Sequence, residues 1–433
     1  MTARAAITGV GVVSPFGLGR DAFFDGLAAG ATAVGPIRSF DADSFPTAVA
    51  GEVPLPVIDP DALIAELGAR GATRAAAVVE PLARGGALRD RKIAFGLLAA
   101  AEAWRHAGLG DGAGDRAAHL VLGLGLEQAF LDDFAPIFAG GAIRWDAEPG
   151  APLPPTRFRT PVDACARACH RLLGLTGPTV VNASACAAGA LAVAHAAALI
   201  ARGTADVVVC GASDSMVNPL GIGGMSRLGA PSPRRAPDAC RPFDRRRDGL
   251  AIGEGAAVFV VEDERRARAR GARALATVLG AGSTQDAYRA TAPRPDGAAA
   301  AAAIARALAR AGLAPADLGY VNAHGTGTPL NDPAECRALH RALGDHAARV
   351  PVSSIKGAIG HLMAAAGAIE LAACVMALTR DLLPGTAHHR ERDPDCDVDV
   401  LGPAPVARAV AHTLSNSFGF GGQNAAVILG RAS

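Results

Sequence analysis

The sequence predicts an α/β protein made of two similar halves that pack as a pseudo-twofold pair. Strand-like runs alternate with helical stretches along the chain, which favours layers of helices on a largely parallel sheet. The strand-like runs are apolar throughout, as expected for strands that are covered on both faces. Segments of the second part of the chain also echo segments of the first part, in the same order.

The echo covers strands, helices and loops. A strand ending in small residues opens each half, a helix and then a strand with a Gly-rich loop follow, another strand feeds a helix, and a last strand closes the unit. The pairs are RAAITGVGVVS (4–14) with ALATVLGAGST (274–284), HAGLG (106–110) with RAGLAP (310–315), AHLVLGLG (118–125) with LGYVNAHGTG (318–327), TVVNASACAAG (179–189) with PVSSIKGAIGH (351–361), and EGAAVFVVE (254–262) with QNAAVILG (423–430). We therefore predict halves at residues 1–265 and 266–433. A single doubly wound α/β domain would explain the alternation but not the duplication.

The stretch after Cys186 predicts a helix that is buried on all sides. Its sequence, AAGALAVAHAAALIARG (187–203), is small and apolar on nearly every helical face. A helix of this kind belongs inside a protein. We expect it to lie between two sheets.

Composition restricts the class of protein. Half of the 433 residues are apolar, and the net charge of +1 gives no reason to expect binding to nucleic acid or to a membrane. Eight unevenly spaced cysteines favour reduced thiols over a disulfide framework. The N-terminus lacks a signal-peptide layout, and Arg, Asp or Gly interrupts each apolar run before it reaches membrane-spanning length. These features predict a cytoplasmic protein.

Lysine is scarce, because the basic residues are nearly all arginine and the two lysines are Lys92 and Lys356. A lysine kept in such a background can mark a place where a compact ammonium group is needed. Chance retention would give the same pattern. The pattern draws attention to Lys356, which precedes His361 by five residues.

Cys186 is a candidate nucleophile because it follows a predicted strand and starts the buried helix. The positive end of a helix dipole and nearby N–H groups can stabilise a thiolate there. The small neighbours Ala185, Ala187 and Gly189 allow a substrate carbonyl to approach the backbone. A buried structural cysteine is the alternative interpretation.

Two histidines occupy similar places. His324 lies in NAHGTGTPLND just beyond a predicted strand, and His361 lies at another strand-to-helix junction. Active sites of parallel sheets assemble at the carboxyl ends of strands, so these histidines and Cys186 form a candidate site. Each histidine alone would more often be a structural hydrogen bonder.

A Gly-rich loop with two phenylalanines, NSFGFGGQNA (416–425), precedes the last predicted strand. Its N–H groups could line an oxyanion hole, and an ordinary tight turn is the alternative. Cys165, Cys169 and His170 do not predict a metal site, because no second ligand pair has zinc spacing. The Arg-rich stretch 232–249 fits either a docking patch or a solvated, locally paired loop.

Together these segments resemble the β-ketoacyl-[acyl-carrier-protein] synthase family, of the elongating Cys-His-His kind. Five motifs occur in the family's order: SACAAG, RPFDRRRDGLAIGEGAA, NAHGTGTPLNDPAE, SSIKGAIGHLMAAAG and NSFGFGG. The resemblance implies a thiolase-like fold with two α/β halves in an α-β-α-β-α arrangement. It also implies condensation of a malonyl unit with an acyl chain, in fatty-acid or polyketide and polyene biosynthesis. The substrates would arrive on the phosphopantetheine of an acyl carrier protein, with no permanently bound cofactor and no metal.

The resemblance also assigns roles to individual residues. Cys186 would be the acylated nucleophile, and His324 and His361 would promote decarboxylation of the malonyl thioester. Lys356 would organise the site, with Glu335 as the buried acid beside it. The remaining roles fall to the backbone N–H groups of Cys186 and Phe420 as an oxyanion hole, Phe420 also as a gate, Thr326 and Thr328 on the phosphopantetheine arm, and Phe418 and Met225 in substrate binding.

Two departures leave the substrate open. Between Leu122 and Val162 the chain is longer than in housekeeping fatty-acid enzymes, with RWDAEPGAPLPPTRFRTP (144–161), and Met225 stands where phenylalanine is usual. Homodimerisation and pairing with a chain-length-factor-like subunit are both open. The chain itself does not resemble such a factor, because it has the nucleophilic cysteine. A degradative thiolase is disfavoured because the last loop holds Phe418 and Phe420 in place of a second cysteine.

Overall fold

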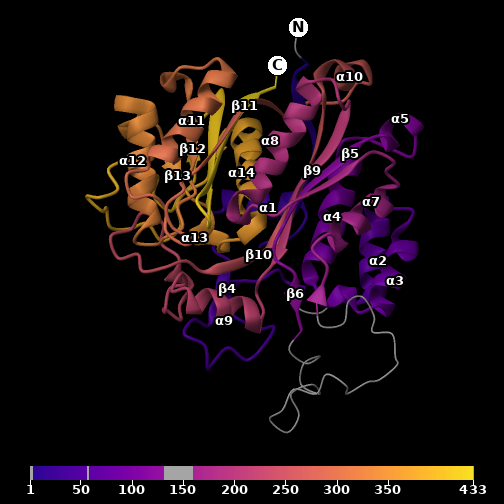
Figure 1. Cartoon of the computed structure of the whole chain (residues 1–433), viewed down its shortest axis with the longest axis horizontal. Coiled ribbons are helices and arrows are strands. Elements are labelled where there is room, and N and C mark those ends of the chain that lie inside the picture. The colour runs from indigo at the N-terminus through magenta and orange to yellow at the C-terminus, as the bar shows by residue number, and fades with distance from the viewer. Residues whose placement is uncertain (1–2, 56–57, 131–158, 433) are drawn as a thin grey trace.

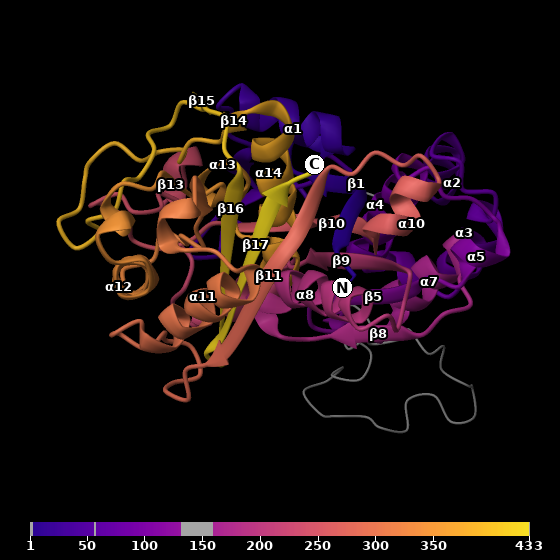
Figure 2. The same ribbon diagram turned by 90° about the horizontal axis from the view of Figure 1, so that it is seen from above.

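Helices and sheets form five layers in the computed structural model, which describes residues 3–55, 58–130 and 159–432. From one side to the other lie outer helices, a sheet, a central pair of helices, a second sheet and further outer helices (Figure 1; Figure 2). This arrangement agrees with the α-β-α-β-α prediction. Most of the predicted long loop at 144–161 lies outside the described residues.

Each half contributes five strands in the same spatial order, which is third, second, fourth, fifth and first in the chain. In the first half these are β8 (Thr179–Asn182), β5 (His119–Leu124), β9 (Val207–Ser215), β10 (Ile252–Asp263) and β1 (Ala5–Ser14). In the second half they are β13 (Val352–Ser353), β12 (Tyr320–Asn322), β16 (His412–Gly419), β17 (Gln423–Arg431) and β11 (Ala276–Gln285). The duplication in sequence is therefore a duplication of topology.

The sheets are mixed, which corrects the prediction of a largely parallel sheet. β10 runs antiparallel to β9 and β1, and β17 runs antiparallel to β16 and β11. The other pairs within each half, β5 with β8 and β9 and β12 with β13 and β16, are parallel. β17 reverses because only a tight turn separates it from β16, and such a connection joins antiparallel strands. The halves join where β1 pairs with β11 over three residues.

The outer helices cover one face of each sheet. α4 (Arg91–His106) packs on β1, β9 and β10, and α11 (Ala298–Ala311) packs on β11 and β17. The other long outer helices are α2 (Pro60–Ala69), α3 (Ala75–Arg84) and α7 (Ala164–Leu173) in the first half and α12 (Asn331–Leu343) in the second. The predicted boundary after residue 265 falls within the short helix α10 (Glu264–Ala269), and the division at that residue remains a prediction.

The central layer consists of α8 (Ala188–Ala201) and α14 (Ala366–Arg380), which pack on each other between the sheets (Figure 2). A 3₁₀ turn precedes each helix, and the first residues of the two turns, Ala185 and Met363, have φ values of 47° and 48°. A Cβ on Gly189 would lie 2.5 Å from the backbone N of Ala368. Glycine thus permits the close contact of the two helices near their N-terminal ends.

The segment Met363–Arg380 is also long and apolar enough to cross a bilayer, but 89% of it is buried inside the protein. It is a core helix, because both of its sides are covered by sheets. The helix after Cys186 is likewise central, as the sequence predicted.

Candidate active site

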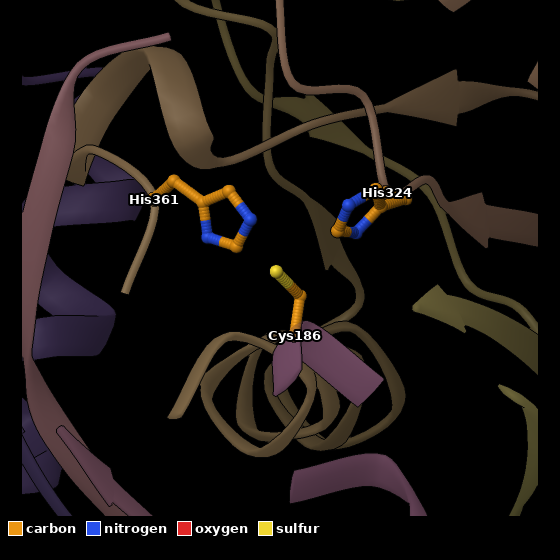
Figure 3. A group of neighbouring side chains, drawn as sticks. All are labelled: Cys186, His324 and His361. Atoms are coloured by element: carbon orange, nitrogen blue, oxygen red, sulfur yellow. The ribbon is translucent and has the colours of Figure 1, made fainter. Parts of the chain in front are cut away.

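Three side chains from separate segments meet at one end of the central layer. Cys186 follows β8 and precedes α8, His324 follows β12, and His361 lies between α13 (Lys356–Ile359) and α14. Their sulfur and nitrogen atoms point toward one another and lie within 4.8 Å of one another (Figure 3). The two imidazole rings are 5.3 Å apart and nearly perpendicular. The structure therefore brings together the three residues that the sequence singled out.

Burial raises the pKa of the Cys186 thiol to about 11, although the positive charge of Lys356 and the backbone N–H of Phe420 oppose this effect. The sequence suggested thiolate stabilisation at the helix start. The structure differs because the apolar surroundings of the thiol outweigh those favourable contacts. The resting group is a thiol that must lose its proton during acyl transfer.

His361 is neutral and presents an N–H to the cluster. Its Nδ1 accepts a hydrogen bond of 3.1 Å from the backbone N–H of Met363, so the proton of the neutral ring belongs on Nε2. Burial and the positive charge of Lys356 hold its pKa well below the usual value. The ring is thus a hydrogen-bond donor at neutral pH.

His324 has the same character through a different partner. The Lys356 Nζ lies 3.3 Å from its Nδ1, and an ammonium group only donates, so Nε2 of His324 also carries the proton. Burial, then Lys356 and then His361 lower the pKa of His324 well below its ordinary value. The site therefore offers two neutral Nε2–H donors beside one thiol.

The spacing of Cys186, His324 and His361 would also suit a metal ion, but the hydrogen bonds oppose coordination. A metal-bound imidazole needs its other nitrogen to donate a proton outward. Here both Nδ1 atoms face donors, namely the Met363 N–H and the Lys356 ammonium. The arrangement favours proton donation to a substrate over metal ligation.

Lys356 forms a buried ion pair with Glu370 of α14, and its Nζ also donates to the carbonyl oxygen of His324. Burial raises the pKa of Glu370 to about 7, while Lys356 opposes the shift. Glu335 was predicted to be the acid beside Lys356, and this prediction is wrong in detail, because the paired acid is Glu370. Sequence analysis missed Glu370 because it lies inside an apolar helical stretch.

Glu335 is buried and has another task. Its carboxylate accepts hydrogen bonds from the backbone N–H groups of His324 (2.9 Å) and Gly325 (2.8 Å). Asp332 accepts from the N–H groups of Thr326 (3.0 Å) and Gly327 (3.2 Å). Both acids belong to the first turns of α12, so this helix holds the loop after β12 in place.

The hydroxyls of Thr326 and Thr328 lie 2.9 Å apart on that loop and face the same cavity as Cys186. The cavity has a volume of about 310 Å³. Its wall includes every predicted site residue except Lys356 and Glu335, namely Cys186, Met225, His324, Thr326, Thr328, His361, Phe418 and Phe420. At its mouth Leu228 and Leu330 are 53% and 61% exposed. Lys356 and Glu335 do not line the cavity, but both contact the backbone of His324, which does.

The loop after β16 closes the other side of the cavity. The backbone N–H of Phe420 lowers the pKa of the Cys186 thiol, and a Cβ on Gly419 would lie 3.2 Å from the Cys186 N. Two backbone N–H groups, those of Cys186 and Phe420, therefore lie beside the thiol. The Phe418 ring is 5.8 Å from the His324 ring. Met225 packs with Met363 and Phe420 in a small apolar cluster.

The Arg-rich stretch 232–249 is locally paired. Arg241 is almost fully buried, with ion pairs to Asp238 and Asp248, and Arg246 pairs with Asp244. The locally paired interpretation of this loop is therefore the better one. Cys165 and Cys169 are buried in the core of the first half, and His170 lies 3.2 Å from the Gly177 carbonyl oxygen.

Comparisons with known proteins agree with this site. The sequence models described as "Beta-ketoacyl synthase, N-terminal domain" and "Beta-ketoacyl synthase, C-terminal domain" match residues 2–267 and 275–390. The chain is 37% identical to the tetracenomycin polyketide synthase ketoacyl synthase alpha subunit of Streptomyces glaucescens, over 99% of this chain and 97% of that protein. It is 34% identical to 3-oxoacyl-[acyl-carrier-protein] synthase 2 of Coxiella burnetii (strain RSA 493 / Nine Mile phase I), over 99% and 98%.

A solved structure gives the same result. The ishigamide ketosynthase/chain length factor superposes with a TM-score of 0.84 at 31% identity, with 100% of both chains covered. The chain belongs to the β-ketoacyl synthase family. The thiolase-like fold and the acyltransferase class that the resemblance implied are confirmed.

Proposed function

We propose that this β-ketoacyl synthase condenses a malonyl thioester with an acyl group held on Cys186. The observation that carries the proposal is the meeting of one thiol and two neutral imidazole N–H donors in a single buried cavity. The product is a β-ketoacyl thioester, two carbons longer than the primer. The cytoplasm is the proposed location.

In the first step the Cys186 sulfur attacks the carbonyl carbon of an acyl thioester. The N–H groups of Cys186 and Phe420 stabilise the negative charge on the carbonyl oxygen as the tetrahedral intermediate forms. The carbon–sulfur bond to the carrier then breaks, and the proton lost by the Cys186 thiol ends on the departing carrier thiol. Met225 and its apolar neighbours adjoin the acyl chain, and Phe420 gates entry of the second substrate.

In the second step a malonyl thioester occupies the same cavity and loses carbon dioxide. The electron pair of the broken carbon–carbon bond forms an enolate, whose oxygen accepts hydrogen bonds from His324 and His361. The enolate carbon attacks the acyl carbon on Cys186, and a new carbon–carbon bond forms as the sulfur leaves. Cys186 takes up one proton and returns to the resting thiol.

Both substrates arrive on the phosphopantetheine arm of an acyl carrier protein. Thr326 and Thr328 offer hydroxyls to the amides of such an arm along the cavity wall. The exposed Leu228 and Leu330 at the mouth would contact the carrier itself. No permanently bound cofactor is needed for either step.

The partner subunit is either a second copy of this chain or a chain-length-factor-like protein. Among the described residues β8 is the last strand on its side of the first half's sheet, and Val180 on it is 37% exposed, so this edge could pair with a strand of another subunit. β8 leads directly to Cys186, so a subunit paired there would lie near the acyl end of the cavity.

The proposed function is tested with purified protein, malonyl carrier thioester and a panel of acyl carrier thioesters. We expect release of carbon dioxide, an acyl mass on Cys186 and a product extended by two carbons. The assay is run with the chain alone and with a co-expressed chain-length-factor-like protein, which distinguishes the two dimers. Absence of acylation and of carbon dioxide release under both conditions contradicts the proposal.

Replacement of Lys356 by arginine is expected to lower malonyl decarboxylation by about tenfold or more. The Lys356 ammonium touches His324 Nδ1, the His324 carbonyl and Glu370 in a fully buried place. A wider planar guanidinium does not fit these contacts at once. Carbon dioxide release measures the effect, and Lys356→Met separates loss of charge from change of shape. Near-normal turnover of Lys356→Arg would show that the ammonium shape is unimportant.

The substrate preference is expected to depend on Met225. Methionine adapts its shape to a ligand better than a phenylalanine ring does, so we propose that the enzyme prefers unsaturated, aryl or otherwise unusual primers. Met225→Phe should narrow the range of primers loaded on Cys186 by several-fold in relative rate, while malonyl decarboxylation continues. Competition between saturated and polyene or aryl carrier thioesters, followed by intact-mass measurement, checks this. A wild-type preference for saturated medium-length chains contradicts it.

A further inference from the structure

A second polar network contacts the turn that follows His361, and the proposed mechanism does not use it. The centre of this network is Asp214, the next-to-last residue of strand β9, before the loop to α9 (Pro219–Arg227). Asp214 is only 2% exposed. Its carboxylate fills the space above Gly125, where a Cβ would overlap it. A buried carboxylate is costly in free energy unless hydrogen bonds or opposite charges compensate for its lost hydration.

One partner lies in the turn that follows His361. The Oδ2 atom of Asp214 accepts a hydrogen bond of 2.9 Å from the backbone N–H of Ala364. Ala364 belongs to the 3₁₀ turn Met363–Ala365, and the N–H of Met363 is the group that donates to His361 Nδ1. The carboxylate thus fixes the turn that selects the tautomer of His361.

The turn needs such support because of its backbone. Met363 has φ 48°, a left-handed conformation that is unfavourable for a residue with a side chain. The equivalent turn in the other half, Ala185–Ala187, has the same feature at Ala185 and carries Cys186 at the position of Ala364. The N–H of Cys186 is left for the substrate, whereas Asp214 occupies the N–H of Ala364.

Behind Asp214 a chain of buried groups fixes the carboxylate. The N–H of Ser215 donates to Asp214 Oδ1 (2.8 Å), and the Ser215 hydroxyl donates to Asp90 Oδ1 (3.1 Å). Lys92, the other lysine of the sequence, forms an ion pair with Asp90 and donates to the carbonyl oxygen of Leu126 (2.9 Å). Asp90, Lys92 and Ser215 are each at most 3% exposed. Burial raises the pKa of Asp214 to about 6, and the Ala364 N–H, Lys92 and the Ser215 N–H oppose the rise.

We infer that Asp214, held through Ser215 and Asp90 by Lys92, is a positioning residue for decarboxylation: it fixes the Met363–Ala364 turn and thereby aims the Nε2–H of His361. The inference rests on the proposed function. Loss of Asp214 should therefore affect decarboxylation more than acyl loading. The enolate needs His361, whereas acylation of Cys186 uses the oxyanion N–H groups. The negative charge of Asp214 also raises the pKa of the Cys186 thiol, so its removal does not hinder loading.

The test compares Asp214→Ala with wild type in two assays, carbon dioxide release from malonyl carrier thioester and acyl loading of Cys186. We expect decarboxylation to fall about tenfold and loading to stay within about threefold. Asp214→Asn keeps an oxygen that accepts the Ala364 N–H and should recover most of the activity. Glu262→Gln is the control, because Glu262 is a buried carboxylate on the neighbouring strand β10 that pairs with Arg266 and Arg270, outside the cavity.

A double-mutant cycle distinguishes positioning from a general loss of structure. If Asp214 acts through His361, Asp214→Ala causes no more than a twofold further loss in a His361→Ala background, but still costs about tenfold in a His324→Ala background. Equal loss in both backgrounds, parallel loss of loading and decarboxylation, or unchanged decarboxylation would each overturn the inference. Absence of decarboxylation in the wild type would instead count against the proposed function.

Discussion

Cys186→Ala is expected to abolish acyl loading and to lower condensation by about 10⁴-fold or more. Loss of a nucleophile removes the covalent intermediate, and comparable losses in other enzymes are of this order or larger. Malonyl decarboxylation should persist, because the enolate is stabilised by His324 and His361 and not by sulfur. Intact-mass measurement after incubation with an acyl carrier thioester checks loading, and carbon dioxide release checks decarboxylation.

The other cysteines supply matched controls for Cys186. Cys165, Cys210 and Cys336 are as buried as Cys186, but they lie in the hydrophobic cores and do not line the cavity. Their alanine variants should load acyl groups at near-normal rates, with only the modest stability loss of a small core truncation. An acyl adduct on the Cys186→Ala protein would contradict the assignment of the nucleophile.

The main features of the fold were predictable because the sequence repeats its pattern of strands and loops. The pairing of RAAITGVGVVS with ALATVLGAGST identified β1 and β11, and the apolar stretch after Cys186 identified a central helix. The direction of β10 and β17 was not predictable. A buried antiparallel strand between two neighbours is as apolar as a parallel one, so its pattern does not reveal its direction.

The site residues that directly follow strands, such as Cys186 and His324, were predictable, because reactive side chains at strand ends mark an active site. The partner of Lys356 was not, because Glu370 lies inside α14, 14 positions further along the chain, and a turn and a helix start separate the two residues. Glu335 and Asp332 sit in the NDPAE run that follows the Gly-rich loop. Acids at a helix start are a signal for backbone N–H partners, and that signal could have identified their task. The high pKa of Cys186 depends on tertiary burial and has no local signature.

His324→Ala and His361→Ala are each expected to lower malonyl decarboxylation by at least about a hundredfold, which corresponds to about 2.7 kcal/mol. Each ring donates an Nε2–H to the enolate oxygen, a negative charge that develops only in this step, so part of Cys186 loading should remain. His361→Gln places an amide N–H near the position of Nε2 and should recover part of the rate.

His346 supplies the control for the two histidine variants, because its Nε2 contacts the Leu318 carbonyl (2.9 Å) and it does not line the cavity. His346→Ala should decarboxylate normally. Carbon dioxide release and intact-mass loading, measured on the same preparations, separate the two steps. Wild-type decarboxylation in either His324→Ala or His361→Ala would contradict the two-donor mechanism, whereas loss of both steps together would mean that the imidazoles also serve acylation.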